Sequence, residues 1–173
     1  IHNSALISKL GKTRGTAQEY KKALVETATI LHENITTQME QLGSRALANT
    51  LYSYAKMGDT DDSVVRSSTM QLCTDSWLNE ASKECTEKVD DFNPYDLANT
   101  VWALAKLQYK DDVVLAVLCK ASVANLADFN PQDLANSMWA LGTLEYRDDA
   151  VLVALCEASM ANLGGFKPQE LSN

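Results

Sequence analysis

Phe92–Leu107 reads FNPYDLANTVWALAKL, and this stretch decides the fold because the chain repeats it. It returns as FNPQDLANSMWALGTL at Phe129–Leu144, and the first part of a third copy, FKPQELSN, occupies Phe166–Asn173. The three copies begin 129 − 92 = 37 and 166 − 129 = 37 residues apart. A fixed period in this range is typical of repeat proteins, in which each unit stacks on its neighbours. The sequence therefore predicts an all-α solenoid of stacked helical hairpins.

Each regular unit begins with residues that favour the start of a helix. Asn93 is a good N-cap, Pro94 suits the first helical position, and Asp96 is favourable near the positive end of a helix. We expect a first helix that ends near residue 107 and a second helix over about 111–127.

The units on the N-terminal side depart from this period. LANT at Leu47–Thr50 is identical to Leu97–Thr100, at an offset of 97 − 47 = 50 residues. This longer unit predicts a second helix over about 61–89 that is either extended or broken near Thr74–Ser76. Residues 16–42 have apolar side chains at nearly heptad spacing, which predicts one long helix.

We expect one helical-repeat domain over residues 1–173. The chain starts with Ile and ends within a repeat, which indicates a fragment of a longer array. The predicted units are approximately 1–41, 42–91, 92–128, 129–165 and a partial unit at 166–173.

The composition is that of a globular protein with an acidic surface. The chain has 46% hydrophobic and 22% charged residues and a net charge of −8. Such a chain repels phosphates unless it presents a basic groove, which argues against tight nucleic-acid binding. One cluster of basic residues stands out, and it is either a solvated turn or a contact for a phosphate or an acidic partner: Lys9, Lys12, Arg14, Lys21 and Lys22.

No residue pattern in the chain is typical of an enzyme. The four cysteines form no CxxC pair, and both histidines are distant from them in sequence, so we predict no metal and no cofactor. Aspartate pairs recur where second helices are expected to begin, as at Asp111-Asp112, and capping is the simpler interpretation. No apolar run is long enough to span a membrane. We therefore predict a non-catalytic protein that acts by binding.

An asparagine recurs at one position of every copy, at Asn49, Asn99, Asn136 and Asn173. In the two complete copies a tryptophan follows three residues later, on the same helix face. Two interpretations are open: the asparagine bonds to the backbone of the next repeat while the tryptophan fills the gap, or the row binds bases or a peptide backbone. The candidate residues for binding RNA or a protein partner are Asn49, Tyr95, Asn99, Thr100, Trp102, Gln132, Asn136, Ser137 and Trp139.

The repeated units resemble the octotricopeptide and heptatricopeptide repeats, closely over Phe92–Asn173 and less closely over Leu47–Asp62. Proteins with such repeats often carry RAP domains and act in organelles. The resemblance implies an α-solenoid, a location in chloroplast or mitochondrion, and RNA binding through the first helix of each repeat. It also implies that four variable positions face the bases, namely Tyr95, Thr100, Gln132 and Ser137.

Because the chain is acidic and its first units are irregular, we predict first a scaffold or assembly module. It would bind protein subunits of a larger organellar complex and be soluble or peripheral to a membrane. The alternative is a sequence-selective organellar RNA-binding protein that acts in transcript processing, stability or translation. The charge on the exposed face of the first helices should distinguish the two.

Overall fold

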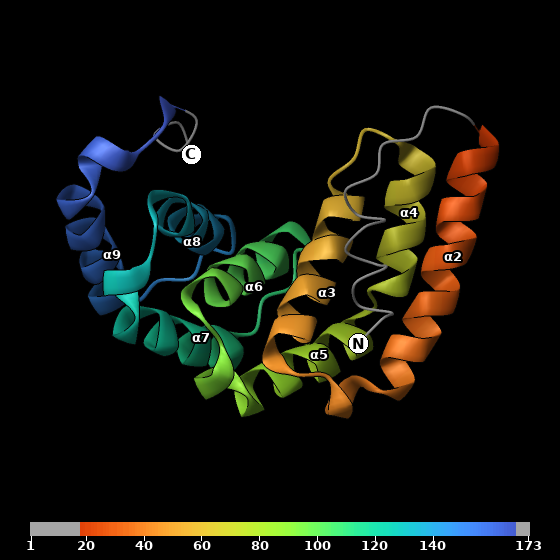
Figure 1. Cartoon of the computed structure of the whole chain (residues 1–173), viewed down its shortest axis with the longest axis horizontal. Helices are drawn as coiled ribbons and strands as arrows, with labels where there is room; N and C mark the ends of the chain where they lie inside the picture. The colour runs from red at the N-terminus through yellow and green to blue at the C-terminus, as the bar shows by residue number, and fades with distance from the viewer. Residues whose placement is uncertain (1–17, 169–173) are drawn as a thin grey trace.

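The computed structural model describes residues 18–168, and every regular element in that range is a helix. The predicted all-α fold is therefore confirmed. The longer helices in Figure 1 are α2 (Gln18–Thr37), α3 (Ser44–Gly58), α4 (Ser63–Leu72), α5 (Asp75–Glu87), α6 (Pro94–Lys106), α7 (Asp112–Ala124), α8 (Pro131–Thr143) and α9 (Asp149–Ala161). Four short 3-10 helices join the units: η1 (Met39–Gln41), η2 (Val89–Asp91), η3 (Leu126–Asp128) and η4 (Leu163–Gly165).

The helices form two layers. α3, α6 and α8 pack side by side as an inner layer, and α5, α7 and α9 form an outer layer behind them. Figure 1 shows the inner helices on the hollowed side of a curved stack. α4 packs on α3 and α2, at the N-terminal end of the stack.

The predicted helix starts are present. The side chain of Asn93 accepts a hydrogen bond from the backbone N–H of Asp96 (2.9 Å), and Asn130 accepts one from Asp133 (3.0 Å). The Asp133 carboxylate also accepts from the backbone of Asn130 at 3.2 Å, which completes a capping box. Asp111 caps α7 through two backbone N–H groups of the first turn. These bonds satisfy donors that would otherwise lack partners at the helix ends.

The longer N-terminal unit contains a break. The predicted second helix is divided into α4 and α5, and the hydroxyl of Thr74 accepts a bond from the backbone of Trp77 to start α5. Of the two alternatives, the broken helix is confirmed. The long helix predicted over 16–42 is wrong at its C-terminal end, because α2 stops at Thr37 and η1 follows. The helices α5, α7 and α9, each the second helix of its unit, are also followed by a 3-10 turn. The helix α2 is therefore the second helix of its own unit.

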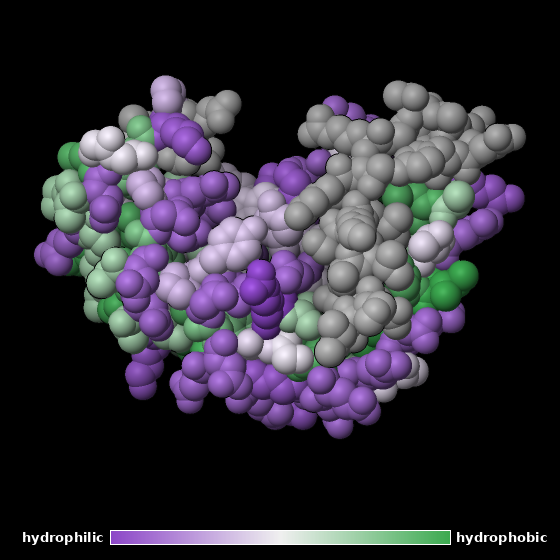
Figure 2. Space-filling model, in the orientation of Figure 1, coloured by the Kyte–Doolittle hydropathy of each residue, from purple (hydrophilic) through white to green (hydrophobic). Residues whose placement is uncertain are grey.

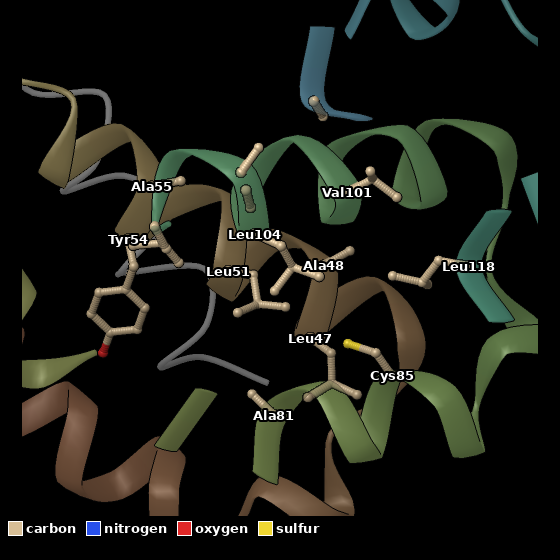
Figure 3. Packing of buried hydrophobic residues seen from close by; sticks show 14 of the residues in the cluster. Leu47, Ala48, Leu51, Tyr54, Ala55, Ala81, Cys85, Val101, Leu104 and Leu118 are labelled. Atoms are coloured by element: carbon tan, nitrogen blue, oxygen red, sulfur yellow. The ribbon is translucent and has the colours of Figure 1, made fainter. Parts of the chain in front are cut away.

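The core fills the space between the two layers (Figure 3). Leu51 on α3, Leu104 on α6 and Leu118 on α7 are each at most 1% exposed. Leu51 belongs to the unit before that of Leu104 and Leu118, so the core continues from one hairpin into the next. The hydrophobic effect therefore stabilises the stack as a whole.

A cluster of three rings joins α2, α3 and α5. Nδ1 of His32 lies 3.0 Å from the hydroxyl of Tyr54, and the His32 ring centroid lies 5.1 Å from that of Trp77. The Trp77 indole N–H donates to the hydroxyl of Thr36 at 2.9 Å. Burial lowers the pKa of His32 below its ordinary value of 6.5, against a smaller raising effect from Glu33.

We expect the protein to lose stability as the pH falls below 6.5. In that range the unfolded chain binds a proton at His32 before the folded protein does, so acidification favours unfolding. Urea unfolding at pH 7.5 and pH 5.5 measures the loss. The variant His32→Phe keeps a ring against Trp77 and should show a smaller difference between the two pH values. An equal difference in both proteins would contradict this assignment.

Candidate binding face of the inner helices

Equivalent positions on the three inner helices carry aromatic rings that contact one another. We call Tyr52 of α3, Trp102 of α6 and Trp139 of α8 the aromatic ladder. The ring centroids of Tyr52 and Trp102 are 5.2 Å apart, and those of Trp102 and Trp139 are 6.3 Å apart, with the planes tilted by 41° and 39°. All three side chains are partly exposed. The rings therefore fill the gaps between repeats and also present part of their surface to solvent.

Two lysines lie over these rings. Lys56 Nζ is 5.5 Å from the ring centroid of Trp102. Lys106 Nζ is 5.6 Å from the centroid of Trp102 and 4.8 Å from that of Trp139. All three distances are within the range of cation–π attraction. The two tryptophans of the ladder are thus both in contact with a lysine.

The solvent-accessible charges of the inner helices are all positive. The three helices contain the cations Arg45, Lys56 and Lys106, and their two acidic residues, Asp96 and Asp133, are buried. The remaining described acids lie on the outer helices, on α2 and in the turns. In Figure 2 the lower rim, over α5 and α7 in the view of Figure 1, is almost entirely hydrophilic. The net charge of −8 therefore does not describe the inner layer.

The first turns of the inner helices present a second row of side chains at equivalent positions, Arg45, Tyr95 and Gln132, and all three are exposed. Burial raises the pKa of Asp96, and the nearby Arg45 guanidinium partly offsets this rise. Burial also raises the pKa of Tyr52, and Tyr95 adds to the rise, which places Tyr95 beside the ladder. The predicted sites Tyr95 and Gln132 are thus accessible to a ligand.

Thr100 and Ser137 are not accessible, and the prediction that they face bases is wrong. Thr100 is 0% exposed and donates its hydroxyl to the backbone oxygen of Asp96 at 2.8 Å, while Ser137 is 4% exposed. One residue along an α-helix is a rotation of about 100°. A position directly after the asparagine is therefore turned into the protein interior.

One of the two interpretations of Asn49, Asn99 and Asn136 was that their amides bond to the backbone of the next repeat. Within residues 18–168 no hydrogen bond joins these amides to the backbone of a neighbouring repeat. Asn99 is nevertheless only 5% exposed, between the inner helices. The buried side-chain polar atoms that lack a partner in residues 18–168 are the hydroxyls of Ser82 and Ser137, and they do not include the amide of Asn99.

Most of the other predicted residues cannot be placed relative to this face. Lys9, Lys12, Arg14 and Asn173 lie outside the described residues, as does the side chain of Lys21. Lys22 is exposed on α2 and lies 3.8 Å from Glu26 in an i,i+4 ion pair. Lys22, the member of the basic cluster whose side chain the structure describes, is therefore on α2 and not on the inner helices.

Lys56 and Lys106, the two lysines that lie over the aromatic ladder, were not predicted from the sequence to be binding residues. Lys56 follows Tyr52 by four residues and Lys106 follows Trp102 by four, at the same offset of 106 − 56 = 50 that relates the two LANT segments. Residues four apart share a helix face, so this spacing was the signal.

Residues 18–168 lack two further features. None of these helices combines the length and the apolarity that crossing a membrane requires. The described His, Cys, Asp and Glu side chains form no group that could hold a metal ion.

One family of known proteins matches the chain. Its profile, described as "Tbc2 translation factor, N-terminal domain", matches residues 65–173. The match begins in α4 and includes the ladder residues of α6 and α8. No curated protein matches the chain significantly. The description does not mention octotricopeptide or heptatricopeptide repeats, so that resemblance stays a prediction.

Proposed function

Because the chain belongs to the family of Tbc2 translation factor N-terminal domains, we propose that it acts in translation by binding single-stranded RNA along the aromatic ladder. The observation that carries this proposal is the row of three partly exposed rings with Lys56 and Lys106 lying over its two tryptophans. Aromatic side chains give bases a surface for stacking, and lysines neutralise the phosphates between them.

The spacing of the rings limits how bases can bind. A base stacked between two rings requires about twice the 3.4 Å stacking distance of nucleic acids, or roughly 7 Å between parallel planes. The rings of the ladder are closer than this, at 5.2 and 6.3 Å, and are tilted. Bases would therefore stack on the exposed sides of the rings, with the partly exposed Asn49 and Asn136 available for hydrogen bonds.

The distribution of charge favours RNA over the scaffold function that we predicted first. That prediction relied on the net charge of −8, but the inner helices expose only cations. The cores of protein interfaces are depleted in lysine, whereas here lysines lie over the central rings. We further propose that the protein is not an enzyme, and that it works in chloroplast or mitochondrion as the repeat resemblance implies.

Salt dependence tests the proposal. Lys106 is paired with Asp59, so Arg45 and Lys56 are the cations of the inner helices that can each neutralise one phosphate of a single strand. In that case log K should fall with log salt at a slope of about −1.4. Affinity for a labelled RNA of about 20 nucleotides should then decrease roughly 7-fold between about 50 and 200 mM salt. Fluorescence anisotropy at the two concentrations gives the slope.

A double variant distinguishes the ladder from the rest of the surface. Replacing Lys56 and Lys106 by glutamine should reduce the slope to about −0.7, since one phosphate contact remains. The matched control replaces Lys83 and Lys120, two exposed lysines of the outer helices. RNA binding that is insensitive to salt, or equally weakened by both double variants, would reject the proposed face.

A further inference from the structure

A pocket of about 390 Å³ opens where α3 and α6 end, next to the ladder. The side chains that determine its chemistry are Asp59, Asp61, Arg66, Met70, Lys106 and Trp139. Its volume lies at the lower end of the range for small-molecule sites. The helix α4, which distinguishes the longer unit from the regular repeats, supplies Arg66 and Met70.

The charged groups of the pocket balance one another. Lys106 Nζ donates to Asp59 Oδ1 at 3.0 Å. Arg66 donates through Nε to the backbone oxygen of Thr60 at 3.0 Å and through Nη2 to the same atom. With two cations and the two carboxylates of Asp59 and Asp61, the pocket has no net charge. A phosphate group is therefore a poor fit, and a neutral ligand with polar edges is a better one.

The walls of the pocket suit a flat ring. Trp139 contributes an aromatic surface, and the side chain of Met70, 39% exposed, contributes a flexible apolar one. The Lys106 ammonium lies 4.8 Å from the centroid of the Trp139 ring. Because this ammonium lies over the Trp139 ring, a flat ring that enters the pocket beside Trp139 is close to the Lys106–Asp59 pair.

We propose that this pocket binds one guanine base of the RNA, an inference that rests on the proposed function. The Watson–Crick edge of guanine has the acceptor O6 followed by two donors, N1–H and N2–H. Lys106 donates to O6, and the two oxygens of Asp59 accept from N1–H and N2–H. Adenine, cytosine and uracil each offer only one donor group to a carboxylate on that edge. Lys106 as the donor and the Asp59 carboxylate as the acceptor of two hydrogen bonds therefore select guanine.

Nucleotide titrations test the pocket without requiring a long RNA. GMP, AMP, CMP and UMP are added separately to the ¹⁵N-labelled chain, and the indole N–H signal of Trp139 is followed. We expect GMP to shift this signal at concentrations about tenfold lower than the other three. In Asp59→Asn an amide N–H₂ replaces one acceptor, and the preference for GMP should disappear.

The control variant is Asp149→Asn. Asp149 is also paired, with Arg147 at 2.9 Å, but it lies on α9 outside the pocket. This variant should keep the preference for GMP, and circular dichroism should show that both variants are folded. Equal shifts by all four nucleotides, or a GMP preference that survives Asp59→Asn, would overturn the inference.

The binding of short RNAs tests the guanine pocket separately from the proposed RNA-binding ladder on which the inference rests. A uridine 12-mer with one central guanosine should bind about tenfold more tightly than one with a central adenosine. Salt-sensitive binding with no such difference would reject the guanine pocket and leave the ladder intact. A guanine-dependent shift of Trp139 without RNA binding would instead reject the ladder.

Discussion

Replacing Trp102 by alanine is expected to weaken the binding of single-stranded RNA about 10- to 100-fold. Loss of a base–aromatic stack costs about 1–3 kcal/mol per base. Trp102 is the central ring of the ladder, and it contacts the rings of Tyr52 and Trp139 as well as the ammonium groups of Lys56 and Lys106. Its loss therefore removes a stacking surface and also releases the two lysines. Anisotropy titrations at low salt measure the effect.

Two variants separate stacking from structural damage. Trp102→Phe keeps a smaller ring and should retain most of the affinity. Tyr146→Ala removes an aromatic side chain of similar partial burial that packs against the core outside the inner helices. This control should leave the affinity for RNA within about twofold. If Trp102→Ala binds RNA as well as the unmodified protein does, the ladder is only a packing element between repeats.

Replacing Leu118 by alanine is expected to destabilise the protein by about 2–5 kcal/mol. Leu118 is 0% exposed on α7 and lies in the core between the two layers (Figure 3). The change removes buried apolar surface and leaves a cavity between neighbouring hairpins. For a protein of this size, each 1 kcal/mol corresponds to roughly 2–4 °C in Tm. Urea unfolding gives the free energy, and thermal unfolding gives the shift in Tm.

The matched control lies on the same helix. Val113 is 74% exposed, and Val113→Ala should change the free energy of unfolding by no more than about 0.5 kcal/mol. A loss below about 1 kcal/mol for Leu118→Ala would mean that the hairpins do not share one continuous core.

Local features of the fold could be predicted from the sequence because they depend on neighbours in the chain. The caps at Asn93, Asn130 and Asp111 each use atoms within three residues, so residue type and spacing were sufficient. The period of 37 residues likewise indicated the helical hairpins before any contact was known. The turns after α6 and α8 could not be predicted from a glycine at the helix end, because the left-handed residues there are Gln108 (φ 57°) and Glu145 (φ 50°).

The composition of the binding face depended on contacts between repeats. Which side of a first helix is covered is decided by the helices on either side, so Thr100 and Ser137 were expected at the surface and are buried. The same packing leaves Asn99 only 5% exposed, without the hydrogen bond to a neighbouring repeat that one interpretation assigned to it.

Tertiary packing also decided the charge that a ligand would meet. Lys56 and Lys106 are fifty residues apart in a chain of net charge −8, yet both lie over the ring of Trp102 because α3 and α6 are adjacent. Electrostatic interactions depend on distance in space, so the total charge could not reveal this concentration of cations. The repeat that begins at Phe92 therefore specified the scaffold from sequence alone, while the stacking of its copies produced the face that we propose binds RNA.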